Sequence, residues 1–318
     1  MALKHESVAN RLNRRIRWLL APSAVALCAF ASAQDVPYCG DEGVWFQILG
    51  SGGAEITDQR GAASYMVWID ENARLLVDPG PGTALRFDEA GADFADLDAV
   101  VFTRLAAQTT SDLPALLEGS IGGDRDRLLP VFGPSVADVD ATTAFVERMV
   151  GASGLFPELA DFLTFRSRGG YKVSVRDVPA TGNRRWSQYG TSNLSLAAIP
   201  VHHGNVPALA WRVEIRDFAI VFAGSFSNQK DVVARFARGA DALVAHHAIP
   251  EDARGSVREF HAIPSQLGRV AAQGDVRMLV LGHRTTRTTG RESASRAAIE
   301  AHYEGPLVFA NELECWGL

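Results

Sequence analysis

Residues 75–83 read LLVDPGPGT and residues 98–103 read DAVVFT. The first stretch is an apolar run of strand length that ends at Asp78, where alternating proline and glycine turn the chain. The second stretch is rich in valine and ends at Thr103, so it also predicts a buried strand followed by polar residues. Loop positions at strand ends are where α/β proteins place their sites.

Outward from these two stretches, apolar runs of strand length recur with helix-like segments between them. The predicted strands are residues 44–49, 64–69, 74–77, 99–102, 194–201, 208–214, 218–222, 242–245 and 278–281. The predicted helices are residues 111–118, 138–150, 229–237, 264–272 and 293–302. Strands early in each half run consecutively and later ones alternate with helices, which favours a mixed α/β layered sandwich over a regular βα barrel.

Residues 165–192 stand apart because they carry six basic residues together with Tyr171, Trp186 and Tyr189. A basic lid over a site for an anionic ligand would have this composition, since its charge attracts anions. A solvated hairpin would have it too, and we favour the hairpin.

The length and composition indicate a globular protein. Of 318 residues, 47% are hydrophobic and 21% are charged, which is enough to bury a sizeable core. At the N-terminus, five basic residues precede a 13-residue apolar run and then Ala31, Ser32 and Ala33. This pattern is typical of a secretory signal, and the run is too short to span a bilayer. We therefore expect a signal peptide over residues 1–33, then a single domain over residues 34–318 that is periplasmic or secreted, without stable membrane association.

Charge and cysteine usage narrow the function further. Removal of residues 1–33 leaves 26 basic and 36 acidic residues, a net charge of −10, which disfavours a nucleic-acid partner. Two cysteines remain, Cys39 and Cys315. In an oxidising compartment they are expected to form a disulfide, and two unrelated thiols are the alternative. The loop-entropy model gives such a long closure roughly 4 to 5 kcal/mol.

The histidines point to a site. Six of them lie at or just beyond the ends of predicted strands, or in the loops after them: His202, His203, His246, His247, His261 and His283. This shared placement favours a common pocket. The sequence contains no GxSxG, CxxC or P-loop motif that would suggest other chemistry.

The motifs occur in a recognisable order. Along the chain they are ILGSGG (48–53), LLVDPGPGT, DAVVFT, TSDLPALL (110–117), PVHHGNVPALAWRVE (200–214), VFAGS (221–225) and LVLGHRTTR (279–287). In this order the chain resembles the metallo-β-lactamase superfamily, in its ribonuclease Z and arylsulfatase-like phosphodiesterase branch. The resemblance covers residues 44–309. It implies a four-layer αββα sandwich, with two sheets face to face, helices outside and the site at one edge.

The resemblance also implies seven metal-ligand positions, of which five have changed. The motif HxHxDH should follow DAVVFT directly, but its ligand positions hold Arg104, Ala106, Gln108 and Thr109, and Ser225 replaces a bridging aspartate. The other two ligand positions are retained, as His203 and His283. A catalytic zinc needs three protein ligands and an open position. A guanidinium about 4 Å from a dication would be repelled by about 8 kcal/mol at an effective dielectric of ~20.

Other retained residues suggest what the site still does. By resemblance, Asp78 is the residue that steadies a metal-binding histidine, and His261 in FHAIPSQ is the histidine that donates a proton or assists the leaving group. Arg104 pairs well with phosphate, sulfate or carboxylate. It cannot lower the pKa of a bound water as zinc does, so hydrolysis should be very slow or absent.

Three hypotheses follow. The first is a periplasmic, metal-free pseudoenzyme that needs no cofactor and holds a small anionic molecule with Arg104, His202, His203, His261 and His283. The second is an active hydrolase with one zinc ion in a rearranged site, built from these histidines or from His246 and His247. The third is a stable fold without a ligand, in which the histidines are relics.

Overall fold

The computed structural model describes residues 40, 42–136, 141–164 and 170–318, which form two seven-stranded sheets. The first sheet has the order β14 (Cys315–Gly317), β1 (Val44–Gly50), β2 (Ser64–Ile69), β3 (Asn72–Val77), β4 (Ala99–Val101), β5 (Leu129–Ser135) and β6 (Val173–Pro179). The strands from β14 to β3 pair antiparallel, and those from β3 to β6 pair parallel.

The second sheet repeats this plan. Its order is β13 (Leu307–Phe309), β12 (Met278–Gly282), β11 (Ala242–His246), β10 (Phe218–Gly224), β9 (Ala208–Ile215), β8 (Ser195–Val201) and β7 (Trp186–Gly190). The strands from β7 to β10 pair antiparallel, and those from β10 to β13 pair parallel. In each sheet a set of parallel strands therefore ends at one edge.

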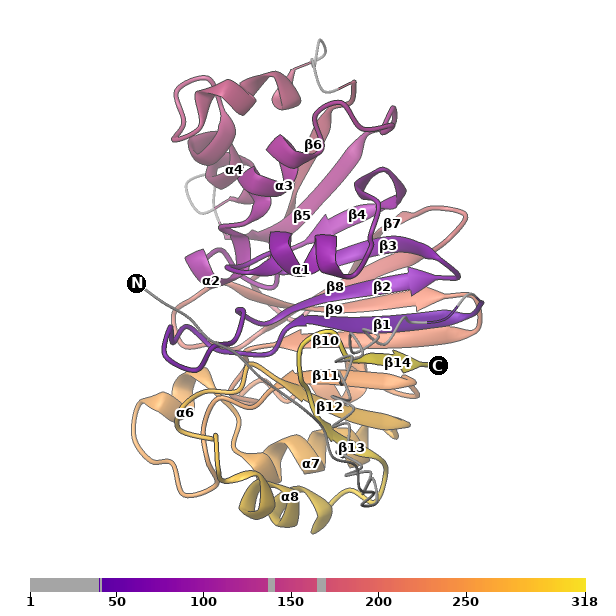
Figure 1. Cartoon of the computed structure of the whole chain (residues 1–318). Coiled ribbons are helices and arrows are strands. Elements are labelled where there is room, and N and C mark those ends of the chain that lie inside the picture. The colour runs from indigo at the N-terminus through magenta and orange to yellow at the C-terminus, as the bar shows by residue number, and fades with distance from the viewer. Residues whose placement is uncertain (1–39, 41, 137–140, 165–169) are drawn as a thin grey trace, which may run out of the picture. The chain divides into compact units, whose positions relative to one another are not determined.

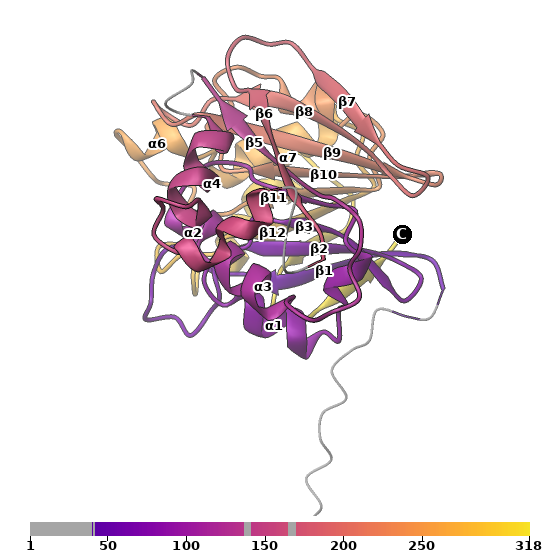
Figure 2. The same ribbon diagram turned by 90° about the horizontal axis from the view of Figure 1, so that it is seen from above.

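Helices cover the outer face of each sheet (Figures 1 and 2). They are α1 (Thr83–Glu89), α2 (Ala107–Thr110), α3 (Leu113–Gly119), α4 (Thr142–Val150), α5 (Val233–Phe236), α6 (Val257–Phe260), α7 (Pro264–Gln273) and α8 (Glu292–Glu300), with 3-10 helices η1 (Phe94–Asp96) and η3 (Pro157–Leu163). Helices α1, α3 and α4 pack on the first sheet, and α5, α7 and α8 on the second.

Three apolar clusters match these layers. The largest lies between the sheets and includes Phe46, Phe132, Trp211 and Phe222. One further cluster fills the space between each sheet and its helices. Because the central strands bury side chains on both faces, the chain forms the four-layer αββα sandwich that the sequence predicted, and the fold class is confirmed.

The structure contains all nine predicted strands, with small differences at their ends. The sequence did not predict β5, β6, β7, β13 and β14. Two of these are only three residues long, β5 contains Pro130, Gly133 and Pro134, and β6 and β7 expose polar side chains. Each therefore lacks the apolar run that marks a strand in sequence. Helix α5 is shorter than predicted, and α4 begins at Thr142 within the described residues.

The predicted hairpin over residues 165–192 is wrong. In the part of this segment that the structure describes, β6 pairs with β5 in the first sheet and β7 pairs with β8 in the second. The segment therefore contributes one edge strand to each sheet. Pairing between distant strands decides this arrangement, and local composition does not reveal it.

Residues 1–33 and Cys39 lie outside the described residues, so the signal peptide, the domain boundary and the disulfide stay predictions. Cys315 is half-buried in β14, at the edge of the first sheet. None of the described helices has the length and apolar character needed to cross a membrane.

Candidate functional site

Strand ends at one edge of the sandwich carry most of the residues selected from the sequence. Asp78 directly follows β3, Arg104 comes three residues after β4, His203 two residues after β8, and His283 directly after β12, while His246 is the last residue of β11. β11 and β12 pair in register, with His246 opposite Gly282. The carboxyl ends of parallel strands meet at one edge, so these side chains converge.

A cavity of about 220 Å³ opens at this edge. Gln108 of α2 and Phe260 of α6 line it, and both helices are labelled in Figure 1. Its lining includes Glu55, Arg104, Gln108, His203, His261, His283 and Arg287. His261 reaches it from the C-terminal end of α6. The structure thus brings together four of the five residues expected to bind an anion.

Arg104 is the central cation of the site, with a side chain that is only 4% exposed. Its Nη1 lies 2.9 Å from His203 Nε2, and His203 Nδ1 lies 2.7 Å from the carbonyl oxygen of Phe260. A carbonyl only accepts, so Nδ1 carries the proton and Nε2 accepts from the guanidinium. Arg104 Nε and Nη2 are buried and have no acceptor among the described residues. Unmet buried donors of this kind are costly.

Contacts between the sheets fix the segment that leads to Arg104. Trp211 Nε1 donates to the carbonyl of Phe102 at 2.9 Å, and the Leu209 amide donates to the carbonyl of Thr103 at 2.8 Å. Gly224 has φ +59°, and a Cβ there would lie 2.9 Å from Thr103 Cβ. The close approach of the two sheets at the site therefore requires a glycine at position 224.

Asp78 holds the segment that leads to Arg104 in place through two hydrogen bonds. It is fully buried and accepts hydrogen bonds from the amide and the hydroxyl of Thr103, both at 2.6 Å. By resemblance, Asp78 was expected to steady a metal-binding histidine. Both of its carboxylate oxygens instead accept from Thr103, the residue before Arg104. Burial raises the pKa of Asp78 to about 7, while the Thr103 hydrogen bonds and the charge of Arg104 oppose the rise.

The remaining imidazoles stack beside Arg104. The ring centroids of His246 and His283 lie 4.4 Å apart, and the two rings are nearly parallel. The ring centroid of His261 lies 5.3 Å from that of His203 and 6.0 Å from that of His283. Ser225 Oγ lies 2.8 Å from His246 Nδ1. His246 Nε2 and His261 Nδ1 are buried without a hydrogen-bond partner in the described part of the chain. His283 has φ +51°, an uncommon conformation for a residue with a side chain.

Burial keeps this cluster neutral. Desolvation, together with the charge of Arg104, lowers the pKa of His203 to about 4. Desolvation and the neighbouring His203 lower the pKa of His261 to about 3, and the pKa values of His246 and His283 also fall well below 6.5. Neutral His261 is a poor proton donor at pH 7.

Two of the six histidines lie elsewhere. His202 Nδ1 contacts Ser227 Oγ at 2.6 Å, and His247 Nε2 contacts Ser295 Oγ at 2.8 Å. Neither histidine lines the cavity. Successive residues at a strand end point to opposite sides, so His203 lines the cavity and His246 stacks behind it on His283, while His202 and His247 point away.

The altered ligand positions form no compensating metal site. Thr109 donates from Oγ1 to the carbonyl of Arg104 and so stabilises the turn into α2. Gln108 lines the cavity, Ala106 offers only a methyl group, and Ser225 contacts His246.

The donor set does not fit the dinuclear zinc that the sequence resemblance implies. His203 uses its lone-pair nitrogen to accept from Arg104, so no free lone pair remains on it. The same guanidinium brings a permanent positive charge into the cluster, where a dication would be repelled. In the described ranges, no group of three or more His, Cys, Asp or Glu residues is arranged to hold a metal ion.

The sequence did not indicate Glu55 or Arg287 as site residues. Glu55 lies in the loop after β1, where one of its carboxylate oxygens is buried and has no hydrogen-bond partner in the ranges that the structure describes. Arg287 lies in the loop after His283. Both stand within or next to the quoted motifs ILGSGG and LVLGHRTTR, and this proximity was the only available signal.

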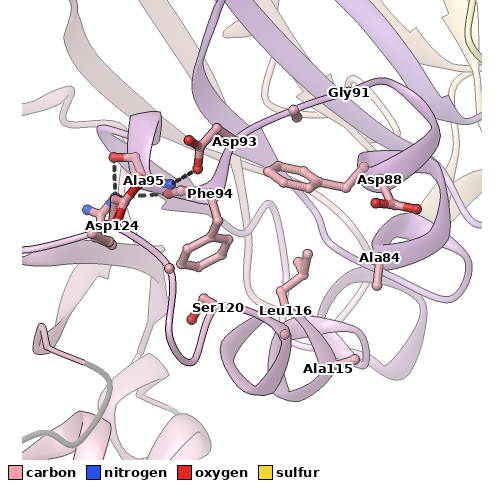
Figure 3. Close-up of a pocket in the computed structure, with 15 residues that line it drawn as sticks. Ala84, Asp88, Gly91, Asp93, Phe94, Ala95, Ala115, Leu116, Ser120 and Asp124 are labelled. Carbon is pink, nitrogen blue, oxygen red and sulfur yellow. Dashed lines mark hydrogen bonds between the residues drawn. The ribbon is translucent and has the colours of Figure 1, made fainter.

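A second cavity, of about 410 Å³, lies apart from the histidines, between α1, η1 and α3 (Figure 3). Phe94 and Leu116 contribute apolar walls, and Asp88, Asp93 and Asp124 are exposed around it. It includes none of the residues that the sequence selected, so the cavity beside Arg104 is the candidate site.

Comparison with known proteins shows which families and structures this chain resembles. A model of the beta-lactamase superfamily domain matches residues 73–284. The ribonuclease Z of Thermobifida fusca is 24% identical over 296 residues, covering 84% of this chain and 92% of that protein. A metallo-beta-lactamase fold protein of Bacillus subtilis, YhfI, superposes with a TM-score of 0.64 at 18% identity, covering 86% of this chain and 98% of its own. The short form of human tRNase Z superposes with a TM-score of 0.65 at 16% identity, and the match covers 86% of this chain and 98% of that protein.

Proposed function

Because this chain belongs to the metallo-β-lactamase superfamily, in its ribonuclease Z-like branch, we propose that it is a metal-free member that binds a small anionic ligand. In this proposal the ligand lies in the cavity beside Arg104, and the chain has lost the metal-dependent hydrolysis of its relatives.

One observation carries the proposal: a buried guanidinium stands in the first metal-ligand position and has two N–H groups without an acceptor in the described residues. A planar guanidinium pairs with both oxygens of a carboxylate, phosphate or sulfate. An anion that accepts from this edge would satisfy both donors and balance a buried charge.

The electrostatics of the cavity support an anionic ligand. The lining contains two arginines, Arg104 and Arg287, and one carboxylate, Glu55. Its histidines are neutral at pH 7. The lining therefore carries a net charge of +1. Neutral imidazoles offer N–H donors to an anion without attracting further charge.

The same features disfavour hydrolysis. An arginine does not generate a hydroxide at neutral pH, as a bound zinc does. The pKa of His261, lowered to about 3, leaves no protonated imidazole to assist a leaving group.

The location and the partners belong to the same proposal. The basic and apolar pattern of residues 1–33 supports export to the periplasm or beyond, and the net charge of −10 without them supports a small molecule over a nucleic acid. N-terminal sequencing of the protein from a periplasmic extract tests this, because we expect it to begin at Gln34.

Metal analysis and anion titration test the binding function. We expect purified mature protein to carry no stoichiometric zinc, and sulfate, phosphate or acetate to raise its melting temperature by binding the folded state. Arg104→Met should remove this effect. Arg296→Met, at a half-exposed arginine on α8, is the matched control and should keep it. Stoichiometric zinc with hydrolysis that His203→Ala abolishes would refute the proposal.

The nitrogens of His246 and His261 that have no partner among the described residues favour a second candidate, a hydrolase in which His246, His261 and His283 rearrange from their present positions to hold one zinc. Imidazole is a common zinc ligand, and three would complete a catalytic site. This candidate predicts one zinc per chain, lost in His246→Ala and retained in the His202→Ala control.

A further inference from the structure

The cavity beside Arg104 adjoins a larger groove of about 540 Å³. The two share Ala54, Glu55 and Gln108 as lining residues, so they meet side by side. The groove lies between the loop after β1 and the start of α2, and most of its lining is small and apolar, including Ala62, Pro81, Ala106 and Ala107.

We propose that the ligand is an amphiphilic monoanion, with its charged group beside Arg104 and an apolar chain in this groove. This inference rests on the proposed anion-binding function and adds the chemical class of the ligand.

The distribution of charge separates the two ends of such a ligand. The cavity holds Arg104 and Arg287 against Glu55, a net charge of +1. The groove shares Glu55 with the cavity and adds one cation, Arg60. Arg60 Nη1 also donates to Ser51 Oγ at 2.7 Å. The two arginines of the cavity therefore stabilise a negative head group at that end, whereas the groove offers a polyanion such as a nucleic acid only Arg60.

The apolar character of the groove comes from independent features. Ile56, at its rim, is 97% exposed, the largest exposed fraction among the large apolar residues of the described chain. Ala106 stands at the second histidine of the altered HxHxDH motif, so a methyl group lines the groove where the resembled motif has an imidazole. An exposed isoleucine beside a mostly apolar hollow with a few polar groups at one end is typical of a ligand site.

Binding of unbranched carboxylates at pH 8 tests the proposal. Acetate, butanoate, hexanoate and octanoate present the same head group with chains of increasing length. We expect each added methylene to tighten binding about fourfold, the equivalent of ~0.8 kcal/mol per buried CH₂, until the groove is filled. Octylamine, with the same chain and a positive head group, should not bind. Arg104→Met should weaken octanoate binding at least tenfold.

Two variants test whether the apolar chain of the ligand lies in the groove. Ile56→Ser removes the apolar rim, and Ala107→Trp fills the groove from an exposed position on α2, so both should reduce the gain from a longer chain. Leu155→Ser is the matched control: this leucine is 79% exposed, lies outside the groove and should leave every affinity unchanged.

The outcomes are distinguishable. If all four carboxylates bind with one affinity that depends on Arg104, the inference is wrong and the anion-binding function stands. If no carboxylate binds, the inference is wrong, and if sulfate and phosphate also fail to stabilise the wild type, the anion-binding function is wrong as well. Octylamine binding as tightly as octanoate, or chain-length dependence that survives Ile56→Ser and Ala107→Trp unchanged, would also overturn the inference.

Discussion

Replacement of Asp78 by Asn tests whether this buried carboxyl group controls the stability of the site. The carboxyl accepts two hydrogen bonds from Thr103, the residue before Arg104. Asn keeps both contacts, because its carbonyl accepts from the amide and its NH₂ donates to the hydroxyl. Asn also tolerates the φ of +52° at this position. The substitution therefore removes a titrating group with little change in shape.

The sign of the effect follows from the raised pKa. Burial moves the pKa of Asp78 from 3.8 to about 7, so the folded state binds a proton that the unfolded state has released. The stability from this group is complete below pH 3.8 and is lost as the pH rises through 7. A shift of about three units corresponds to about 4 kcal/mol. Asn cannot ionise, so the stability of the wild type relative to Asp78→Asn should fall by about 4 kcal/mol between pH 4 and pH 8.

Urea unfolding of both proteins across this pH range gives the measurement, and the difference between the two curves cancels the other titrating groups. Thr103→Val provides a second check. It removes a hydrogen bond that lowers the pKa, so the fall should move to higher pH. A difference that stays constant from pH 4 to pH 8 would refute the reasoning about Asp78.

The structure makes three further predictions about stability. Tyr65→Phe should stabilise the protein by ~1 to 3 kcal/mol in urea unfolding, because the buried Tyr65 hydroxyl has no hydrogen-bond partner among the described residues; an unchanged midpoint would contradict this. The lowered pKa of His261 predicts a loss of about 2 kcal/mol between pH 8 and pH 5, since the unfolded imidazole takes up a proton below pH 6.5 and the folded one does not. In urea unfolding at the two pH values, His261→Asn should lose less stability than the wild type, and equal losses would show that this histidine is not responsible. Gly224→Ala should destabilise more than Gly239→Ala, by roughly 1 to 3 kcal/mol in thermal unfolding, because both have positive φ but only position 224 lacks space for a Cβ; equal effects would exclude a steric cause.

The sequence by itself determined nine of the strands and the order of the motifs, although it missed β5, which carries the core residue Phe132. Apolar runs bounded by glycine and proline, as in residues 75–83, specify a strand and its end through local chemistry alone. The exchange of a metal ligand for Arg104 was likewise readable at one position, because charge and donor chemistry belong to the residue type. Edge strands such as β6 and β7 were missed because their pattern is polar.

Only the tertiary structure decided which side chains share the site. His203 lines the cavity and His246 stacks on His283, which also lines it, whereas their sequence neighbours His202 and His247 pack elsewhere, because strand register sets the direction of every side chain. The hydrogen bond from Arg104 to His203 joins residues 99 positions apart, and Glu55 enters from a separate loop. Such contacts depend on how the two sheets pair and pack, and local sequence carries no record of that packing.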